Sequence, residues 1–273
     1  MTFLQALILG IIQGLTEFLP ISSSAHLVIA PFLLGWQLPN QQVFAFDVLI
    51  QVGTLLAVII YFWNDLYQIL LAFLDALWQR KPFENQTARL GWYLILATLP
   101  AGILGLLLKD KVEAAFNSPV AVSGFLFITA FLLFLAERIG KKVNNLQKLS
   151  WLDALVFGAF QALSIFPGVS RSGSTIAGGM LRHFQRRDAA RFSFLMSIPV
   201  MLAAGVLGTI DLMKVPDLSS FLPVLLLGFL SAAIVGYLSI HWLLGFLMRR
   251  SLNAFALYCA VLGTIVLLLI YAS

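Results

Sequence analysis

LQALILGIIQGLTEFLPISSS, at residues 4–24, aligns without a gap over LDALVFGAFQALSIFPGVSRS, at residues 152–172. The offset is 148 residues, and it also pairs Phe44 with Phe192 and Phe46 with Phe194. The chain therefore carries an internal repeat, with halves at about 1–147 and 148–273 of a single domain, 1–273. The identical positions in the quoted stretches are Leu4, Ala6, Leu7, Gly10, Gln13, Leu15, Phe18, Ser22 and Ser24, which recur as Leu152, Ala154, Leu155, Gly158, Gln161, Leu163, Phe166, Ser170 and Ser172.

The composition places the chain in a membrane. Of its 273 residues, 60% are hydrophobic and 11% are charged, and the mean hydropathy is +0.96. Soluble domains carry about 25% charged residues. A net charge of +5 in such a chain reports orientation in the bilayer, so we expect no nucleic-acid partner. The first basic residue is Arg80, which argues against a cleaved signal peptide. The single Cys259 excludes an internal disulfide framework or a Cys-rich metal site.

Six stretches are long and apolar enough to cross about 30 Å of hydrocarbon. Two further apolar regions, 3–34 and 151–183, are interrupted at LPISSSAH and PGVSRSGST. Each arm is too short to span, so we expect two re-entrant helical hairpins. An apolar stripe along 66–78 predicts an interfacial helix. The expected fold is an all-α integral membrane protein. Its predicted transmembrane helices are 44–63, 90–108, 118–137, 192–213, 221–247 and 252–272.

The basic residues predict the orientation. With the connections 64–89, 138–150, 182–191 and 248–251 in the cytoplasm, 13 Lys and Arg residues lie there, against Lys109, Lys111 and Lys214 outside. This asymmetry follows the positive-inside rule. Both termini are then expected outside, with the first hairpin entering from the outer face and the second from the cytoplasm.

The two hairpins are expected to meet and form one composite site. Three predicted crossings separate the copies, and an odd number inverts the second copy relative to the first. Broken helices of inverted repeats meet near the bilayer midplane, where small anions or ions bind. One copy supplies Glu17, Ser23 and His26, whereas the other supplies Arg171 and further hydroxyls. Small residues at four-residue spacing on both first arms predict close helix packing: Ala6, Gly10 and Gly14, and Ala154, Gly158 and Ala162.

Arg171 is the cation of the predicted site. A charged side chain at membrane depth costs roughly 2.5–3.5 kcal/mol, so it indicates function by default. A salt bridge with Glu17 that only tethers the hairpins is the alternative. An arginine fork, hydroxyls and N–H groups at a helix start form an anion cradle that suits phosphate. The substrate-binding residues are then Ser170, Ser172, Gly173, Ser174 and Thr175, with Ser22 and Gln13 from the first hairpin.

Gln13 and Glu17 are four residues apart and share a helix face. Together they could hold a hard divalent cation, Mg²⁺ or Ca²⁺, completed by water and phosphate. Glu17 could instead act as a general base. His26 is either a structural histidine, or a proton donor or nucleophile beside the serines. No GxxxxGK[ST] occurs, so nucleotide coupling is not indicated.

The motifs QGLTEF, PISSSAH and PGVSRSGST resemble those of the undecaprenyl-diphosphate phosphatase family, also called the bacitracin-resistance family. Its signatures are an (E/Q)xxxE element, here Gln13 to Glu17, and PGxSRSxxT, here Pro167 to Thr175. The resemblance covers nearly the whole chain, including FDVLIQVGTLLAV. Many members have glutamate where this chain has Gln13. An amide cannot be a charged metal ligand or a base, so these roles would fall to Glu17.

The resemblance implies an integral membrane enzyme of bacteria that converts undecaprenyl diphosphate to undecaprenyl phosphate, the lipid carrier for peptidoglycan and other wall polymers. It implies Glu17, Ser23, His26 and Arg171 at the catalytic centre, support of the phosphate by Ser172 and Thr175, and a divalent cation. The attacking group could be Ser23, His26 or a water activated by Glu17.

The predicted orientation opens the site to the periplasmic or extracytoplasmic side of the bacterial inner membrane. The partners expected are the lipid substrate and the membrane, and a homodimer is compatible with this reading. Inverted repeats with broken helices also typify secondary transporters. A transporter or flippase of a polyprenyl phosphate is therefore the alternative function.

Overall fold

The protein is an all-α integral membrane protein. Its structure, a computed structural model, describes residues 1–38, 40–116, 118–212 and 218–272, and this part of the chain contains no named β-strand. The α-helices are α1 (Phe3–Phe18), α2 (Ser23–Leu33), α3 (Asn40–Tyr61), α4 (Trp63–Trp78), α5 (Gln86–Leu107), α6 (Lys109–Phe116), α7 (Pro119–Ile139), α8 (Trp151–Leu163), α9 (Arg171–Leu181), α10 (Arg186–Leu212), α11 (Leu218–Leu247) and α12 (Asn253–Ala272). A short 3₁₀ helix, η1 (Leu146–Lys148), precedes α8. Lys214, which entered the charge count, lies outside the described residues.

The described helices contain five segments long and apolar enough to cross a membrane, in α5, α7, α10, α11 and α12. They correspond to five of the six predicted spans. The remaining span, predicted at 44–63, is the first part of a bent pair. Phe46–Tyr61 of α3 and Trp63–Trp78 of α4 meet at an angle of 76°. The helix expected at 66–78 is therefore present as α4, and its position at the membrane interface stays a prediction.

Both interrupted regions are broken helices, as the sequence predicts. The first break separates α1 from α2, and the second separates α8 from α9. Helix boundaries recur at the 148-residue offset, because α1 and α8 begin at Phe3 and Trp151, and α2 and α9 begin at Ser23 and Arg171. The re-entrant placement of the two hairpins and their opposite orientation in the membrane stay predictions, as does the division into halves.

The caps of these helices recur as well. Thr2 and Ser150 each form a capping box. The side chain of each accepts the backbone N–H of the residue three positions on, Gln5 or Asp153, and the side chain of that residue accepts the backbone N–H of the cap. Ser22 and Ser170 cap α2 and α9 in the same way, accepting the N–H groups of Ala25 and Gly173. Local hydrogen bonding thus starts all four half-helices at equivalent positions of the repeat.

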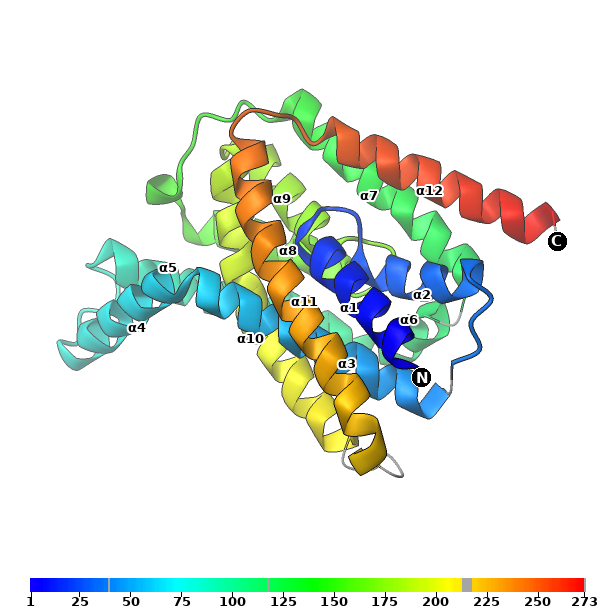
Figure 1. Cartoon of the computed structure of the whole chain (residues 1–273). Helices are drawn as coiled ribbons and strands as arrows, with labels where there is room; N and C mark the ends of the chain where they lie inside the picture. Colours follow the sequence, from blue (N-terminus) through cyan, green and yellow to red (C-terminus); the bar gives the residue numbers. More distant parts are fainter. Residues whose placement is uncertain (39, 117, 213–217, 273) are drawn as a thin grey trace.

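Each first arm packs on a long helix of the other half: α1 lies along α11, and α8 lies along α5 (Figure 1). The small residues predicted to permit close packing make these contacts. A Cβ on Gly10 would lie 2.5 Å from the Gly228 carbonyl oxygen, and one on Gly158 would lie 2.6 Å from that of Ala97. The small stripes therefore seat each arm against a spanning helix rather than against the other arm.

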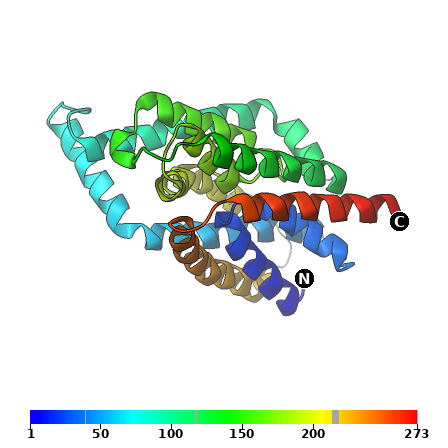
Figure 2. The ribbon, with the colours of Figure 1, turned by 90° about the horizontal axis from the view of Figure 1, so that it is seen from above.

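Two features complete the outline. Helices α7 and α12 run side by side (Figures 1 and 2). The α4 helix and the start of α5 stand away from the body as a helical pair, which is clearest in Figure 2. Large apolar side chains are exposed on these outer surfaces, for example Trp78 at 89%. Such surfaces suit contact with lipid rather than water.

Candidate active site

The two helix breaks lie against each other. The Ser172 hydroxyl donates to the Leu19 carbonyl at 3.0 Å, and the Gly168 N–H donates to the Ser24 hydroxyl at 3.4 Å. Each bond joins the break between α1 and α2 to the break between α8 and α9. The prediction that the two interrupted loops meet is confirmed.

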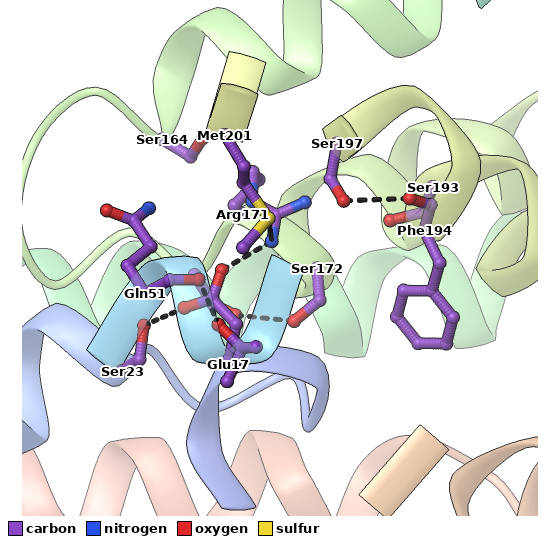
Figure 3. A network of polar contacts seen from close by, with 12 residues as sticks. Glu17, Ser23, Gln51, Ser164, Arg171, Ser172, Ser193, Phe194, Ser197 and Met201 are labelled. Carbon is purple, nitrogen blue, oxygen red and sulfur yellow. Dashed lines mark hydrogen bonds and ion pairs between the residues drawn. The ribbon is translucent and has the colours of Figure 1, made fainter. Parts of the chain in front are cut away.

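Glu17 is the centre of the junction, at the end of α1, and it is only 7% exposed. Its Oε1 accepts from Arg171 Nη2 at 2.5 Å. Its Oε2 accepts from Ser23 Oγ at 2.6 Å and from Gln13 Nε2 at 3.0 Å. Figure 3 shows Arg171 and Ser23 converging on Glu17 from different elements. One hydrogen-bonded cluster thereby joins Gln13, Glu17 and Ser23 of the first copy to Arg171, which is 154 positions after Glu17.

Two polar atoms at the edge of this cluster have no hydrogen-bond partner within the described part of the chain. Arg171 Nη2 also approaches Met201 Sδ at 3.5 Å, but Arg171 Nη1 is buried without a hydrogen bond. The Oε1 atom of Gln13 is buried without one as well, because its amide points Nε2 at Glu17 and, at 3.4 Å, at Thr54. Buried polar atoms are nearly always satisfied. An unpaired cationic donor and an unpaired oxygen beside one carboxylate mark the place where a ligand would bond.

The loop backbones are held in uncommon conformations. Ser22 has φ of 71°, in the region that few non-glycine residues adopt, and Gly168 has φ of +106°. A Cβ on Gly168 would lie 2.3 Å from the Val122 carbonyl oxygen. Thr129 of α7 fixes the second loop, because its hydroxyl donates to the Gly168 carbonyl at 3.0 Å and accepts the Ser170 N–H at 2.9 Å. Backbone strain held by its surroundings is typical of functional sites.

The hydroxyls predicted to line an anion cradle are turned largely into the protein. Ser174 Oγ donates to the Arg171 carbonyl at 3.1 Å, and Thr175 Oγ1 donates to the same carbonyl at 2.6 Å. Thr175 Oγ1 also lies 2.5 Å from Ser193 Oγ of α10. The Gly173 N–H is taken by the Ser170 cap. These bonds rigidify the start of α9, and they leave the N–H groups of Arg171 and Ser172 without an intrahelical partner. Direct contact of Ser22, Ser170, Ser172, Gly173, Ser174 and Thr175 with a substrate stays a prediction.

His26 lies one turn into α2 and is held at both nitrogens. Its Nδ1 is 2.7 Å from the Ser22 carbonyl oxygen, and its Nε2 is 2.7 Å from the Tyr258 hydroxyl. A carbonyl can only accept, so Nδ1 carries a proton, whereas in the second bond either Nε2 or the Tyr258 hydroxyl can be the donor. The imidazole therefore adjoins the first loop but does not bond to Glu17 among the contacts of the described residues. Its catalytic role stays a prediction.

The residues expected to hold Mg²⁺ or Ca²⁺ are Gln13 and Glu17. Among the residues that the structure describes, no group of three or more His, Cys, Asp or Glu side chains converges. Mg²⁺ is often bound by one or two carboxylates, with substrate phosphates and water as its other ligands. The Glu17 carboxylate and the unpartnered Gln13 Oε1 form an all-oxygen donor set of this kind. They fit a hard cation that takes its remaining ligands from a bound phosphate.

Several residues of the site carry no signal in the sequence. The sequence is that of an ordinary apolar helix around each of Thr54, Thr129, Met201 and Tyr258. No local motif therefore distinguishes these residues from packing residues. Figure 3 also places Gln51 and Ser164 beside the cluster. The positions of Thr54, Thr129, Met201 and Tyr258 become apparent only when α3, α7, α10 and α12 are packed around the two breaks.

The chain matches the family model described as "Bacitracin resistance protein BacA" over residues 6–265. Three relatives named undecaprenyl-diphosphatase are similar over nearly their full lengths. The one from Chloroherpeton thalassium is 44% identical over 278 residues, covering 98% of this chain and 96% of the relative. The one from Thermomicrobium roseum is 44% identical over 273 residues, covering 97% of each. The one from Myxococcus xanthus is 43% identical over 270 residues, covering 99% of this chain and 90% of the relative. These names do not favour the transporter alternative.

Proposed function

The chain belongs to the bacitracin resistance protein BacA family, and from this premise we infer that it hydrolyses undecaprenyl diphosphate to undecaprenyl phosphate and inorganic phosphate. It would thereby recycle the lipid carrier for peptidoglycan and other cell-wall polymers and confer resistance to bacitracin. The single observation that carries this inference is the cluster at Glu17. A hydroxyl is paired with a buried carboxylate there, beside an arginine that has one unpaired donor.

In the proposed reaction, Arg171 Nη1 and the N–H groups at the start of α9 bind the terminal phosphate. Ser23 Oγ attacks the terminal phosphorus, and its proton passes to Glu17 Oε2. The bond from that phosphorus to the bridging oxygen breaks, and undecaprenyl phosphate leaves with the bonding electrons. Water then attacks the phosphoserine, which releases inorganic phosphate and returns a proton to Ser23. Direct attack by a water held at Glu17 is the variant that needs no covalent intermediate.

The geometry supports these roles. The Ser23–Glu17 distance of 2.6 Å is that of a nucleophile and its base. Charge develops on the phosphoryl oxygens, and a fixed guanidinium stabilises it most in a site that excludes water. Mg²⁺ or Ca²⁺, held by Glu17 and Gln13, would offset diphosphate charge and polarise the bridging bond. His26, with Tyr258 at its Nε2, is proposed to donate a proton during turnover.

We also propose that the site opens to the periplasmic side of the inner membrane. The support is the uneven distribution of basic residues along the chain. Single cysteines in a Cys259→Ala background test this orientation. Trp36→Cys, next to α2, should react with an impermeant maleimide added to intact spheroplasts, whereas Arg249→Cys should react only after lysis. The reverse pattern would invert the orientation. The homodimer stays a prediction.

The enzyme assay is phosphate release from undecaprenyl diphosphate by purified protein in lipid, with Mg²⁺, Ca²⁺ or a chelator. Arg171→Ala should lower the rate about 10²–10³-fold, as removal of a transition-state donor does in other enzymes. Glu17→Gln should lower it at least as much. Arg249→Ala and Glu84→Gln remove the same charges at exposed positions and should retain the wild-type rate. Absence of release by folded wild-type protein with either cation would overturn the proposed function.

A further inference from the structure

A second polar region lies away from the Glu17 cluster, where α5, α10 and η1 come together. It contains a cavity of about 250 Å³ that is lined by Arg89 and Arg191. A second cavity of about 250 Å³, against α4 and α11, shares Arg191 and adds Arg187. None of these arginines belongs to the cluster of Glu17 and Arg171. The first cavity is lined by Gln86, Thr87 and Leu146 as well as by the two arginines.

The charge facing these cavities is unbalanced. Among the described lining residues, Asp65 is the one acid against three arginines, and it accepts from Arg191 Nη2 at 2.6 Å. Asp188 also lies close to Arg187 and Arg191, and its carboxylate accepts the Leu146 N–H. Three guanidinium groups therefore face two carboxylates. Arg89 Nε is buried and has no hydrogen-bond partner among the residues that the structure describes. The N–H groups of Thr87 and Ala88 are taken by the Asn85 cap, so the helix N-terminus is not free to bind an anion. The unpaired guanidinium nitrogen of Arg89 therefore marks the binding position.

The surroundings resemble a lipid headgroup zone. Gln86 and Arg186 begin α5 and α10, at the ends that the basic residues predict to be cytoplasmic. The adjoining α4 exposes Trp63 and Trp78, its first and last residues, at 60% and 89%, and Phe83 in the following loop is exposed as well. Aromatic side chains of this kind concentrate at the membrane–water interface. Basic pockets between helices on the cytoplasmic side bind the phosphates of anionic lipids.

We propose that this cavity binds a phosphate group, through Arg89 and Arg191. An arginine fork matches two phosphate oxygens, and the Thr87 hydroxyl adds a neutral donor to the lining. The group belongs either to the headgroup of an anionic phospholipid or to free inorganic phosphate, and the chemistry of recognition is the same. The proposed phosphate site shares no residue with the Glu17 cluster, so it can be tested whether or not the protein hydrolyses undecaprenyl diphosphate.

Binding is measured on the Arg171→Ala protein, so that the Glu17 cluster contributes no phosphate binding. The probes are inorganic phosphate, a short-chain phosphatidylglycerol and a phosphatidylcholine of equal chain length, titrated by calorimetry at low and high salt. Saturable binding of phosphatidylglycerol alone identifies a lipid headgroup, and equal binding of inorganic phosphate identifies the free ion. Binding should weaken with salt because the contact is ionic.

Arg89→Gln should weaken this binding about tenfold or more, since it removes a charged hydrogen-bond donor. The matched control, Arg249→Gln, removes an exposed positive charge that lines neither cavity and should change the affinity less than about twofold. Thr87→Phe fills the cavity without removing a charge and should also weaken binding, which keeps the test valid if Arg89→Gln folds poorly. The proposal is overturned if neither inorganic phosphate nor phosphatidylglycerol binds saturably. It is also overturned if Arg89→Gln and Arg249→Gln lose the same amount of binding affinity.

Discussion

Apolar replacement of Glu17 and Arg171, singly and together, distinguishes a pair that works in catalysis from one that only tethers the hairpins. The variants are Glu17→Leu, Arg171→Met and the double variant. Breaking a buried ion pair by removing one partner costs about 3–5 kcal/mol, whereas replacing both by apolar residues is often close to neutral. The side chains of Glu17 and Arg171 are 6% and 13% exposed, so the values for a buried pair apply.

The two single variants should differ. After Arg171→Met, the Glu17 carboxylate keeps its hydrogen bonds from Ser23 and Gln13, at 2.6 and 3.0 Å. The cost should lie near the lower limit, about 3 kcal/mol. After Glu17→Leu, the one contact left to the Arg171 guanidinium among the described residues is that of Nη2 with Met201 Sδ at 3.5 Å, and the cost should approach about 5 kcal/mol. The double variant should recover most of the loss, because neither charge is left unpaired.

Thermal unfolding in detergent and phosphate release are the two measurements. At about 2–4 °C per kcal/mol, the single variants should melt on the order of 10 °C below wild type. All three variants should be inactive. Lys81→Met is the control, because Lys81 pairs with Glu84 at 3.0 Å with both side chains exposed, at 56% and 68%, and such a pair contributes less than about 1 kcal/mol. Hydrolysis by the stable double variant would show that the pair is only a tether. Single variants as stable as wild type would refute the buried pairing itself.

Three further substitutions test the site and its scaffold. Ser23→Ala should lower phosphate release about 10³-fold or more with little change in melting temperature; retention of a tenth of the rate would assign the attack to another group. Tyr258→Phe removes the hydroxyl that bonds the His26 imidazole, and it should lower the rate of phosphate release about tenfold and alter its pH profile. The control Tyr271→Phe, at the exposed end of the same helix, should change neither. Equal effects of the two variants would contradict the role of Tyr258 in positioning His26. Gly168→Ala should destabilise the fold by about 3 kcal/mol or more, because φ is +106° and the methyl group would lie 2.3 Å from a carbonyl oxygen of α7. The control Gly245→Ala, where a Cβ would have nothing within 4 Å, should stabilise the fold by up to about 1 kcal/mol. Equal melting temperatures of the two variants would refute this account of the turn.

Much of the scaffold could be predicted because its determinants are local. The breaks at LPISSSAH and PGVSRSGST remove regular helix within a few residues, and Ser22 and Ser170 supply the caps that restart it. Small residues at Gly10 and Gly158 indicate close packing, although the sequence does not say against which helix. Glu17 and Arg171 could be paired in advance because each is the rare charge in an apolar region where broken helices meet.

The sequence predicts separate helices at 44–63 and 66–78, but it does not give the angle of 76° between α3 and α4. The run from Val58 to Leu66 contains no proline or glycine that would mark a sharp bend, and the polar residues Asn64 and Asp65 come after the bend. The bend is associated with packing of α4 on α5, where Gly91 admits the Phe73 ring at 3.0 Å from the position of a Cβ. The pairing of His26 with Tyr258 is unpredictable for the same reason. The two residues are 232 positions apart, and only the packed helices bring them together.

The asymmetry of the site follows from the symmetry of its scaffold. Ser23 and Arg171 occupy equivalent positions of the repeat, each as the first residue of its second half-helix. Both side chains bond to Glu17, one at each carboxylate oxygen. A second arginine in place of Ser23 would leave no hydroxyl beside the base, and a second serine in place of Arg171 would leave the buried carboxylate without a counter-charge. Two copies of one helix start thus place a nucleophile and a phosphate-binding cation on opposite sides of a single base, which identical copies could not do.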